Sequence, residues 1–83
     1  MADYISQRNP DAARHVGARI RETIDLLGAF PDIGRDGALV GTRELVVPGL
    51  PYIVVHRVDR EGGSVVILGI YHGAQLRPGQ QMR

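Results

Sequence analysis

Residues 42–58 read TRELVVPGLPYIVVHRV and divide into two strands around a turn. Residues 42–47 and the run that begins at Tyr52 are rich in β-branched and aromatic residues, which favour strands. Between them, residues 48–51 carry a proline at each end and a glycine, as is typical of a turn. The pattern therefore predicts two antiparallel strands, over residues 42–47 and 52–60.

A second hairpin follows the strand at 52–60. Glu61, Gly62 and Gly63 provide turn residues, and residues 64–72 return as a strongly apolar segment, VVILGI at its centre. The sequence therefore predicts a three-stranded antiparallel sheet.

The segment before the strands has the pattern of a helix. Asn9, Pro10 and Asp11 supply a cap, a first-turn proline and a first-turn acid, and Gly28 and then Pro31 end the helix. Apolar residues recur at spacings of three and four on one stripe: Ala13, Val16, Ile20, Ile24 and Leu27. We expect helices over about residues 3–8 and 10–28, a loop over 31–37, and an α+β fold in which a helical hairpin packs on one sheet face.

Strand alternation predicts that both faces of the sheet are apolar along the first half of the central strand. Tyr52 and Val54 point to one face, and Ile53 and Val55 point to the other. A helical hairpin covers one face only. Large exposed apolar patches are rare on monomers, so we expect another chain to cover the second face. Residues 73–83 carry Gly, Pro, Gln and Arg with little to pack, which predicts a mobile tail.

Composition limits the class of protein. The 83 residues, 43% hydrophobic and 23% charged, suit one small soluble domain spanning 1–83 with a thin core. With no cysteine, neither a disulfide nor a thiolate-bound metal stabilises it, and three scattered histidines predict no metal site or cofactor. A net charge of +1 argues against binding nucleic acid by charge alone. Without a signal or membrane segment, a cytoplasmic location is expected.

Several motifs together resemble one family. The segments TRELVVPG (42–49), PYIVVHRV (51–58) and ILGIYHGA (67–74), with FPDIGR (30–35) upstream, are similar to the RelE/ParE superfamily, the toxins of type II toxin-antitoxin systems. The resemblance implies a helical hairpin on an antiparallel sheet and a cognate antitoxin that wraps and silences the toxin. Family members open with a strand and a full first helix, so a sheet with its first strand missing is expected, from a late start codon, a naturally short protein or an inactivating loss.

The family has two activities. One branch cleaves mRNA on the ribosome, and the ParE-like branch inhibits DNA gyrase without known chemistry. For cleavage, Arg43 and Arg57 are candidates to clamp phosphate, His72 to transfer a proton near neutral pH, and Tyr71 or Glu44 to assist.

Structural interpretations compete with these roles. Arg43 and Glu44 could form a solvated pair, and Arg57 could pair with Asp59 on its own strand. His56 is expected to be packed and hydrogen-bonded, and His15 to face solvent. Tyr71 and His72 are neighbours on a strand, so they point to opposite faces unless Gly69 or Gly73 breaks the pleat.

The absence of one arginine favours the ParE-like branch. The ribonuclease branch tends to carry an arginine after the aromatic residue that opens the central strand, and here Ile53 follows Tyr52. The sequence therefore predicts a non-enzymatic toxin with an antitoxin as partner and gyrase as target. The alternatives are a ribonuclease acting on ribosome-bound mRNA and an inactive remnant that still binds antitoxin; homo- or hetero-oligomers are open in each case.

Overall fold

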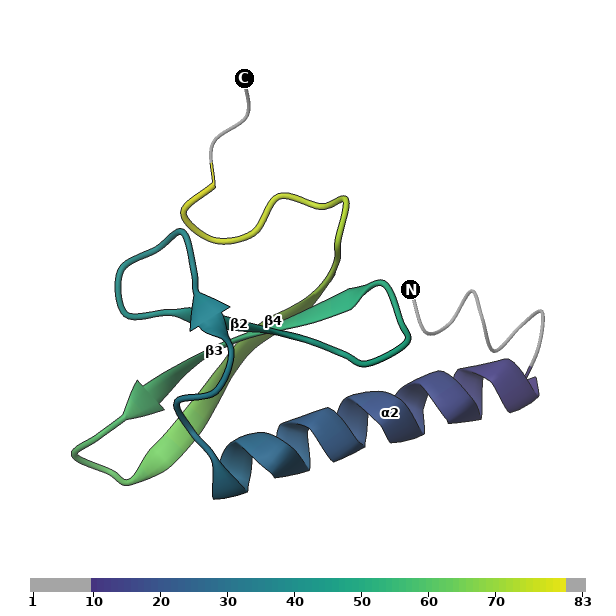
Figure 1. The fold of residues 1–83 in the computed structure, drawn as a ribbon, viewed down its shortest axis with the longest axis horizontal. Helices are drawn as coiled ribbons and strands as arrows, with labels where there is room; N and C mark the ends of the chain where they lie inside the picture. Colours follow the sequence, from purple (N-terminus) through teal and green to yellow (C-terminus); the bar gives the residue numbers. More distant parts are fainter. Residues whose placement is uncertain (1–9, 81–83) are drawn as a thin grey trace.

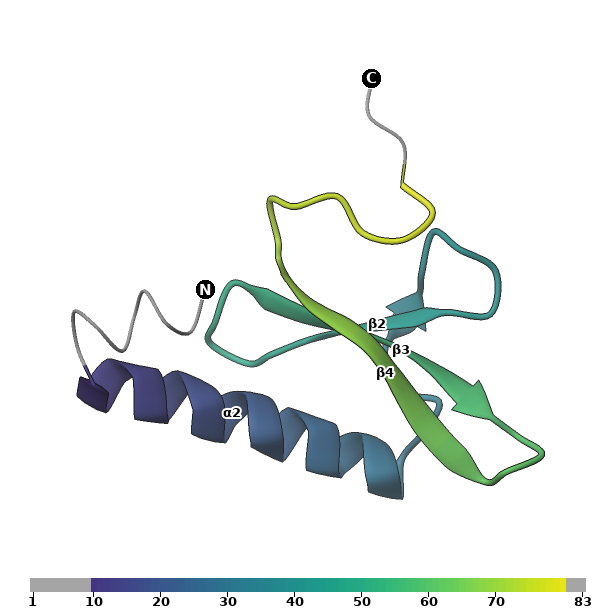
Figure 2. The ribbon, with the colours of Figure 1, turned by 180° about the vertical axis from the view of Figure 1, so that it is seen from behind.

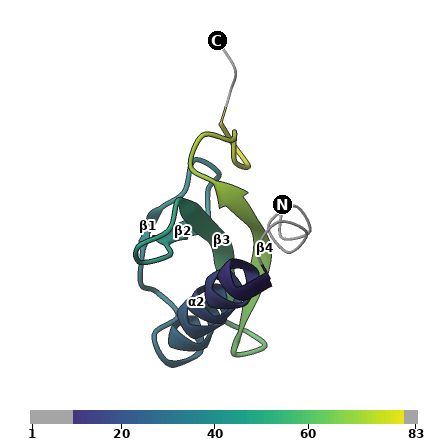
Figure 3. The ribbon, with the colours of Figure 1, turned by 90° about the vertical axis from the view of Figure 1, so that its right-hand side faces the viewer.

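The computed structural model describes residues 10–80. One helix, α2 (Pro10–Ala29), packs against a four-stranded antiparallel sheet (Figure 1). The strands are β1 (Arg35–Asp36), β2 (Arg43–Val46), β3 (Tyr52–Asp59) and β4 (Ser64–His72). Figure 3 shows them side by side in chain order. The predicted α+β class is confirmed, while the helix predicted over residues 3–8 lies outside the described residues.

The sheet has one strand more than predicted. Three strands lie where the sequence placed them, within one residue at each end, but part of the expected loop 31–37 forms β1, which pairs Arg35 with Glu44 and Asp36 with Arg43. Gly34 allows this approach, because it has a φ of 100° and a Cβ there would lie 2.6 Å from the Glu44 carbonyl oxygen. The prediction of three strands is therefore wrong, because the sheet has a fourth strand, β1. A strand of two residues is too short to show an alternating sequence pattern.

Helix α2 buries the stripe that its spacing predicts. Leu27 is fully buried, and Val16 and Ile20 pack against a core cluster that includes Val54 of β3. The last helical turn closes with Phe30 N–H donating to Leu26 O at 2.9 Å. Pro31, at the next position, cannot donate a backbone hydrogen bond, so the helix ends there. Among residues 10–80 no helix is long and apolar enough to cross a membrane.

A β-bulge interrupts the pairing of β3 with β4. Val55 is opposite Gly69 and His56 is opposite Ile67, so Leu68 is the extra residue on β4. Alternation along β3 then defines two faces. The helix face, which α2 covers, carries Val54, and the far face carries Val55.

The centre of the far face is buried within the chain itself. Ile53 and Val55 are only 6% and 1% exposed, although α2 lies on the other side of the sheet. Residues 73–80, here called the strap, follow β4 and run along the side of the sheet opposite α2 (Figures 1 and 2). Residues 73–76 are exposed, as expected of a segment with little to pack, whereas the side chain of Arg77 is only 10% exposed. The expectation that a second chain must cover the far face is wrong at the centre of that face, because Ile53 and Val55 are already buried there.

Candidate functional site

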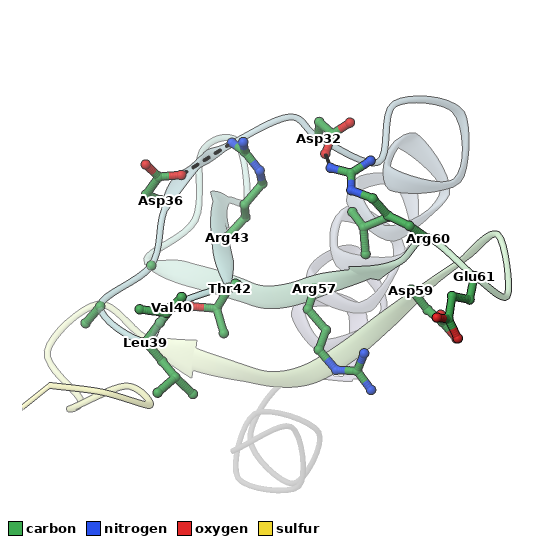
Figure 4. A pocket seen from close by; sticks show the side chains of 14 residues that line it. Asp32, Asp36, Leu39, Val40, Thr42, Arg43, Arg57, Asp59, Arg60 and Glu61 are labelled. Carbon is green, nitrogen blue, oxygen red and sulfur yellow. Dashed lines mark hydrogen bonds and ion pairs between the residues drawn. The ribbon is translucent and has the colours of Figure 1, made fainter.

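An open pocket of about 630 Å³ lies beside the edge of β3, between the loop that precedes β2 and the turn that follows β3 (Figure 4). It forms because β2 starts opposite His56, so the last residues of β3 pair with β4 on one side and with no described strand on the other. Three arginines and four carboxylates line it: Arg43, Arg57, Arg60, Asp32, Asp36, Asp59 and Glu61. The pocket is therefore charged but not predominantly basic.

Two of these arginines are already engaged. Arg60 Nη2 lies 2.8 Å from Asp32 Oδ1. Arg43 Nη1 lies 3.8 Å from Asp36 Oδ1 and donates to the Gly34 carbonyl oxygen at 3.3 Å. Arg43 therefore pairs across to β1 rather than with its neighbour in β2, so the interpretation of Arg43 and Glu44 as a solvated pair is wrong.

Arg57 is the pocket arginine without a polar partner among residues 10–80. Its side chain is exposed. The alternative of an ion pair with Asp59 is wrong, since Asp59 Oδ1 instead accepts a hydrogen bond from Gly62 N–H at 3.0 Å and holds the turn after β3. Arg57 is thus free to meet a group from outside the chain.

The four predicted catalytic candidates lie on both faces of the sheet. Arg43 is opposite His56 and His72 is opposite Tyr52, which places both on the helix face. Arg57 and Tyr71 belong to the far face, and Figure 4 shows Arg43 and Arg57 pointing to opposite sides of β3. The bulge precedes Tyr71, so it does not turn Tyr71 and His72 toward one site.

The pocket joins only two of the four. Arg43 and Arg57 line it, whereas Tyr71 and His72 do not. The His72 ring instead packs edge-on against Tyr52, with ring centroids 6.0 Å apart, and its Nδ1 accepts a hydrogen bond from the Ala74 N–H at 3.1 Å. His72 is thus held at the end of β4 by its own neighbours.

A buried ionic cluster lies on the far face, and the sequence did not predict it. Glu44 is 4% exposed, and its Oε1 lies 3.1 Å from Arg35 Nη2 and 3.2 Å from Arg77 Nε. The Nε–H of Arg77 is not aligned for a hydrogen bond, so this contact is an ion pair. Glu44 was predicted as an assisting acid or a surface residue. Its neighbours in β2, Arg43 and Leu45, are only half-buried, so no local pattern signalled its burial, and nothing local indicated Arg77.

His56 is packed as predicted but is not hydrogen-bonded. The side chain is fully buried, and both ring nitrogens have no hydrogen-bond partner among residues 10–80. The predicted hydrogen bond is therefore wrong. A buried polar group without a partner costs about 1–3 kcal/mol. His15, in contrast, is exposed on α2, as predicted.

Replacing His56 with leucine is expected to raise the free energy of unfolding by about 1–2 kcal/mol, because an apolar side chain of similar volume removes two unsatisfied nitrogens. Urea denaturation of the purified protein measures the change. His15→Leu on exposed α2 is the matched control and should change stability by less than about 0.5 kcal/mol. Equal or lower stability of His56→Leu would show that the ring nitrogens find partners in solution.

Within residues 10–80, no three His, Asp or Glu side chains gather into a metal-binding group. The arrangement instead offers two chemical features. One is an exposed, unpaired arginine beside an open pocket, and the other is a buried carboxylate held between two arginines.

Comparisons with known proteins assign the family. The family model described as ParE toxin of type II toxin-antitoxin system, parDE, matches residues 1–77. "Putative toxin Y4kP" of Sinorhizobium fredii is 43% identical over 75 residues, covering 90% of this chain and 75% of that protein. "Toxin RelE2" of Caulobacter vibrioides is 39% identical over 74 residues, covering 89% of this chain and 80% of that protein. No solved structure matches. The chain therefore belongs to the ParE toxin family and is the toxin of a type II toxin-antitoxin system.

Proposed function

We propose that this toxin arrests growth by binding and inhibiting DNA gyrase, and that its antitoxin prevents this by binding the toxin. The observation that carries the proposal is the separation of Arg43 and His72 from Arg57 and Tyr71 on opposite faces of the sheet. A toxin that acts by binding alone needs no converging catalytic groups, so this separation does not impair it.

Cleavage of RNA requires more than the pocket supplies. An acid, a base and cations must converge on one phosphate. The pocket carries four carboxylates against three arginines, and two of the arginines are paired with Asp32 and Asp36. A surface of this balance attracts a polyanion weakly. Ile53 stands where the ribonuclease branch tends to carry an arginine and is buried, so it adds no cation.

A specific observation supports the ribonuclease as the second candidate. Arg57 is exposed, has no partner among the described residues, and shares the far face with Tyr71. One relative is named RelE2. For this activity, Arg57 would clamp the phosphate and Tyr71 would assist on the same face, while His72, on the helix face, would have to reach the phosphate around the end of β4.

Supercoiling by purified gyrase tests the proposal. We expect the toxin at stoichiometric amounts to inhibit supercoiling, and toxin incubated first with its antitoxin to have no effect. Full supercoiling at excess toxin would contradict the proposal. Cleavage of ribosome-bound mRNA that is lost in His72→Gln would instead favour the ribonuclease. Unhindered growth of cells expressing the chain alone would favour an inactive remnant that only binds antitoxin.

A further inference from the structure

The open pocket beside β3 combines one unpaired arginine with exposed aliphatic side chains. We propose that this pocket is a docking site for the antitoxin. One aspartate or glutamate side chain of the antitoxin pairs with Arg57, and a neighbouring aliphatic side chain of the antitoxin packs on Leu39 and Val40. The inference rests on the antitoxin half of the proposed function and does not depend on whether the target is gyrase.

The free guanidinium of Arg57 calls for a carboxylate. Arg57 is exposed, and the residue opposite it on β4 is Val66, an apolar side chain that offers no hydrogen bond. On its other side β3 has no described strand at this position, because β2 starts opposite His56. A guanidinium can donate two parallel hydrogen bonds to one carboxylate, which gives a strong and directional pair. Aspartate or glutamate is therefore the side chain most complementary to Arg57.

The acidic residues of the pocket limit how much negative charge it accepts. Glu61 is exposed, and the side chain of Asp36 is 91% exposed. Neither forms an ion pair with Arg57, so both leave its guanidinium free. A carboxylate in direct contact with Arg57 gains more than it loses to these more distant acids, because salt screens the longer interactions. A nucleic acid brings a phosphate with every nucleotide and meets repeated repulsion. The pocket therefore favours a polypeptide that presents a single acid.

The loop that precedes β2 adds an apolar surface to the same pocket. Val40 is 98% exposed and Leu39 is 48% exposed, and both line the pocket together with Arg57. In the view of Figure 4, Leu39 and Arg57 lie on the same side of β3, opposite to Arg43. Contact with an aliphatic side chain removes this apolar surface from water, which favours binding. The partner segment should therefore carry an aliphatic residue close to its acid.

Hydrogen bonds within the loop fix this apolar surface in place before any partner arrives. Gly37 N–H donates to Thr42 O at 2.8 Å, and Thr42 N–H donates to Leu39 O at 3.1 Å. The Thr42 hydroxyl donates to the same Leu39 oxygen at 2.6 Å, and Thr42 is 6% exposed. A surface that is already ordered loses little conformational entropy on binding. The closed loop thus presents Leu39 and Val40 in a form ready for a partner.

The affinity of the purified toxin for its cognate antitoxin, measured by isothermal titration calorimetry, tests the inference. We expect Arg57→Gln to raise the Kd about thirtyfold or more, because the antitoxin carboxylate then lies in the interface without its cation. Val40→Ser should raise the Kd about fivefold, through loss of apolar contact. The matched control is Arg60→Gln in the same pocket, since Arg60 is already paired with Asp32. This variant should change the Kd less than about threefold.

A charge exchange identifies the antitoxin side chain. The toxin variant Arg57→Glu should bind the antitoxin poorly, and replacing the antitoxin's acidic residues with arginine one at a time should restore binding at one position. A Kd for Arg57→Gln within about twofold of the wild-type value, or no restoring position in the antitoxin, would overturn the inference.

Two further outcomes separate this inference from the proposed function. If Arg57→Gln loses inhibition of gyrase but keeps its affinity for the antitoxin, the pocket serves the target and the inference is wrong. If the wild-type toxin does not inhibit gyrase while Arg57→Gln still binds the antitoxin weakly, the gyrase proposal is wrong and the docking site stands.

Discussion

Replacing Glu44 with alanine is expected to lower the free energy of unfolding by about 3 kcal/mol. The carboxylate is 4% exposed and sits between Arg35 and Arg77. Its removal leaves Arg77, whose side chain is 10% exposed, as a buried cation facing no anion. The side chain of Arg35 is 58% exposed and can turn to water, so most of the cost falls on Arg77 and on the strap that carries it.

The matched control for Glu44 is Asp36, which also pairs with an arginine across the β1–β2 ladder. Asp36 is 91% exposed and lies 3.8 Å from Arg43. Exposed ion pairs contribute little, so Asp36→Ala should change stability by less than about 0.5 kcal/mol. Urea denaturation measures both variants. Similar small losses for the two would mean that water reaches Glu44 and that the cluster is not buried in solution.

The strands and the helix were predictable because their signals are local. The turn at 48–51, the run of strand formers after Tyr52 and the three-and-four spacing along α2 each lie within a single element. The strap was not predictable in this way. Its attachment joins Arg77 to Glu44, residues far apart in the sequence, and no periodicity links a cation in one segment to a carboxylate in another.

The candidate site was predictable only in part for a related reason. Alternation alone indicated that Tyr71 and His72 point to opposite faces, and the register agrees. No sequence pattern indicated the bulge at Leu68. The bulge depends on the register in which β4 pairs with β3, and that register is a property of the folded sheet. The lack of a partner for His56 likewise follows from the packed surroundings and not from its neighbours in the sequence.

Coverage of the far face changes the reason for expecting a partner. The sequence suggested that uncovered apolar area demands a second chain, yet Ile53 and Val55 at the centre of that area are already buried within the chain. The need for an antitoxin now rests on membership of the ParE toxin family. The outer edge of β4 pairs with no strand within residues 10–80, and Leu68 and Ile70 on it are each 39% exposed. That edge, rather than the far face, offers unpaired backbone to another chain.

Replacing Leu27 with alanine is expected to cost about 3 kcal/mol of unfolding free energy, since it removes a fully buried side chain and leaves a cavity between α2 and β3. Small domains have only about 0.1 kcal/mol of stability per residue, so this loss is a large part of the total. Leu26 is the matched control: it is the preceding residue of α2 and is 46% exposed, so Leu26→Ala should cost well under about 1 kcal/mol. Thermal and urea denaturation compare the two variants. Equal losses would mean that α2 does not pack on the sheet through the stripe that contains Leu27, and the helix face described above would then be wrong.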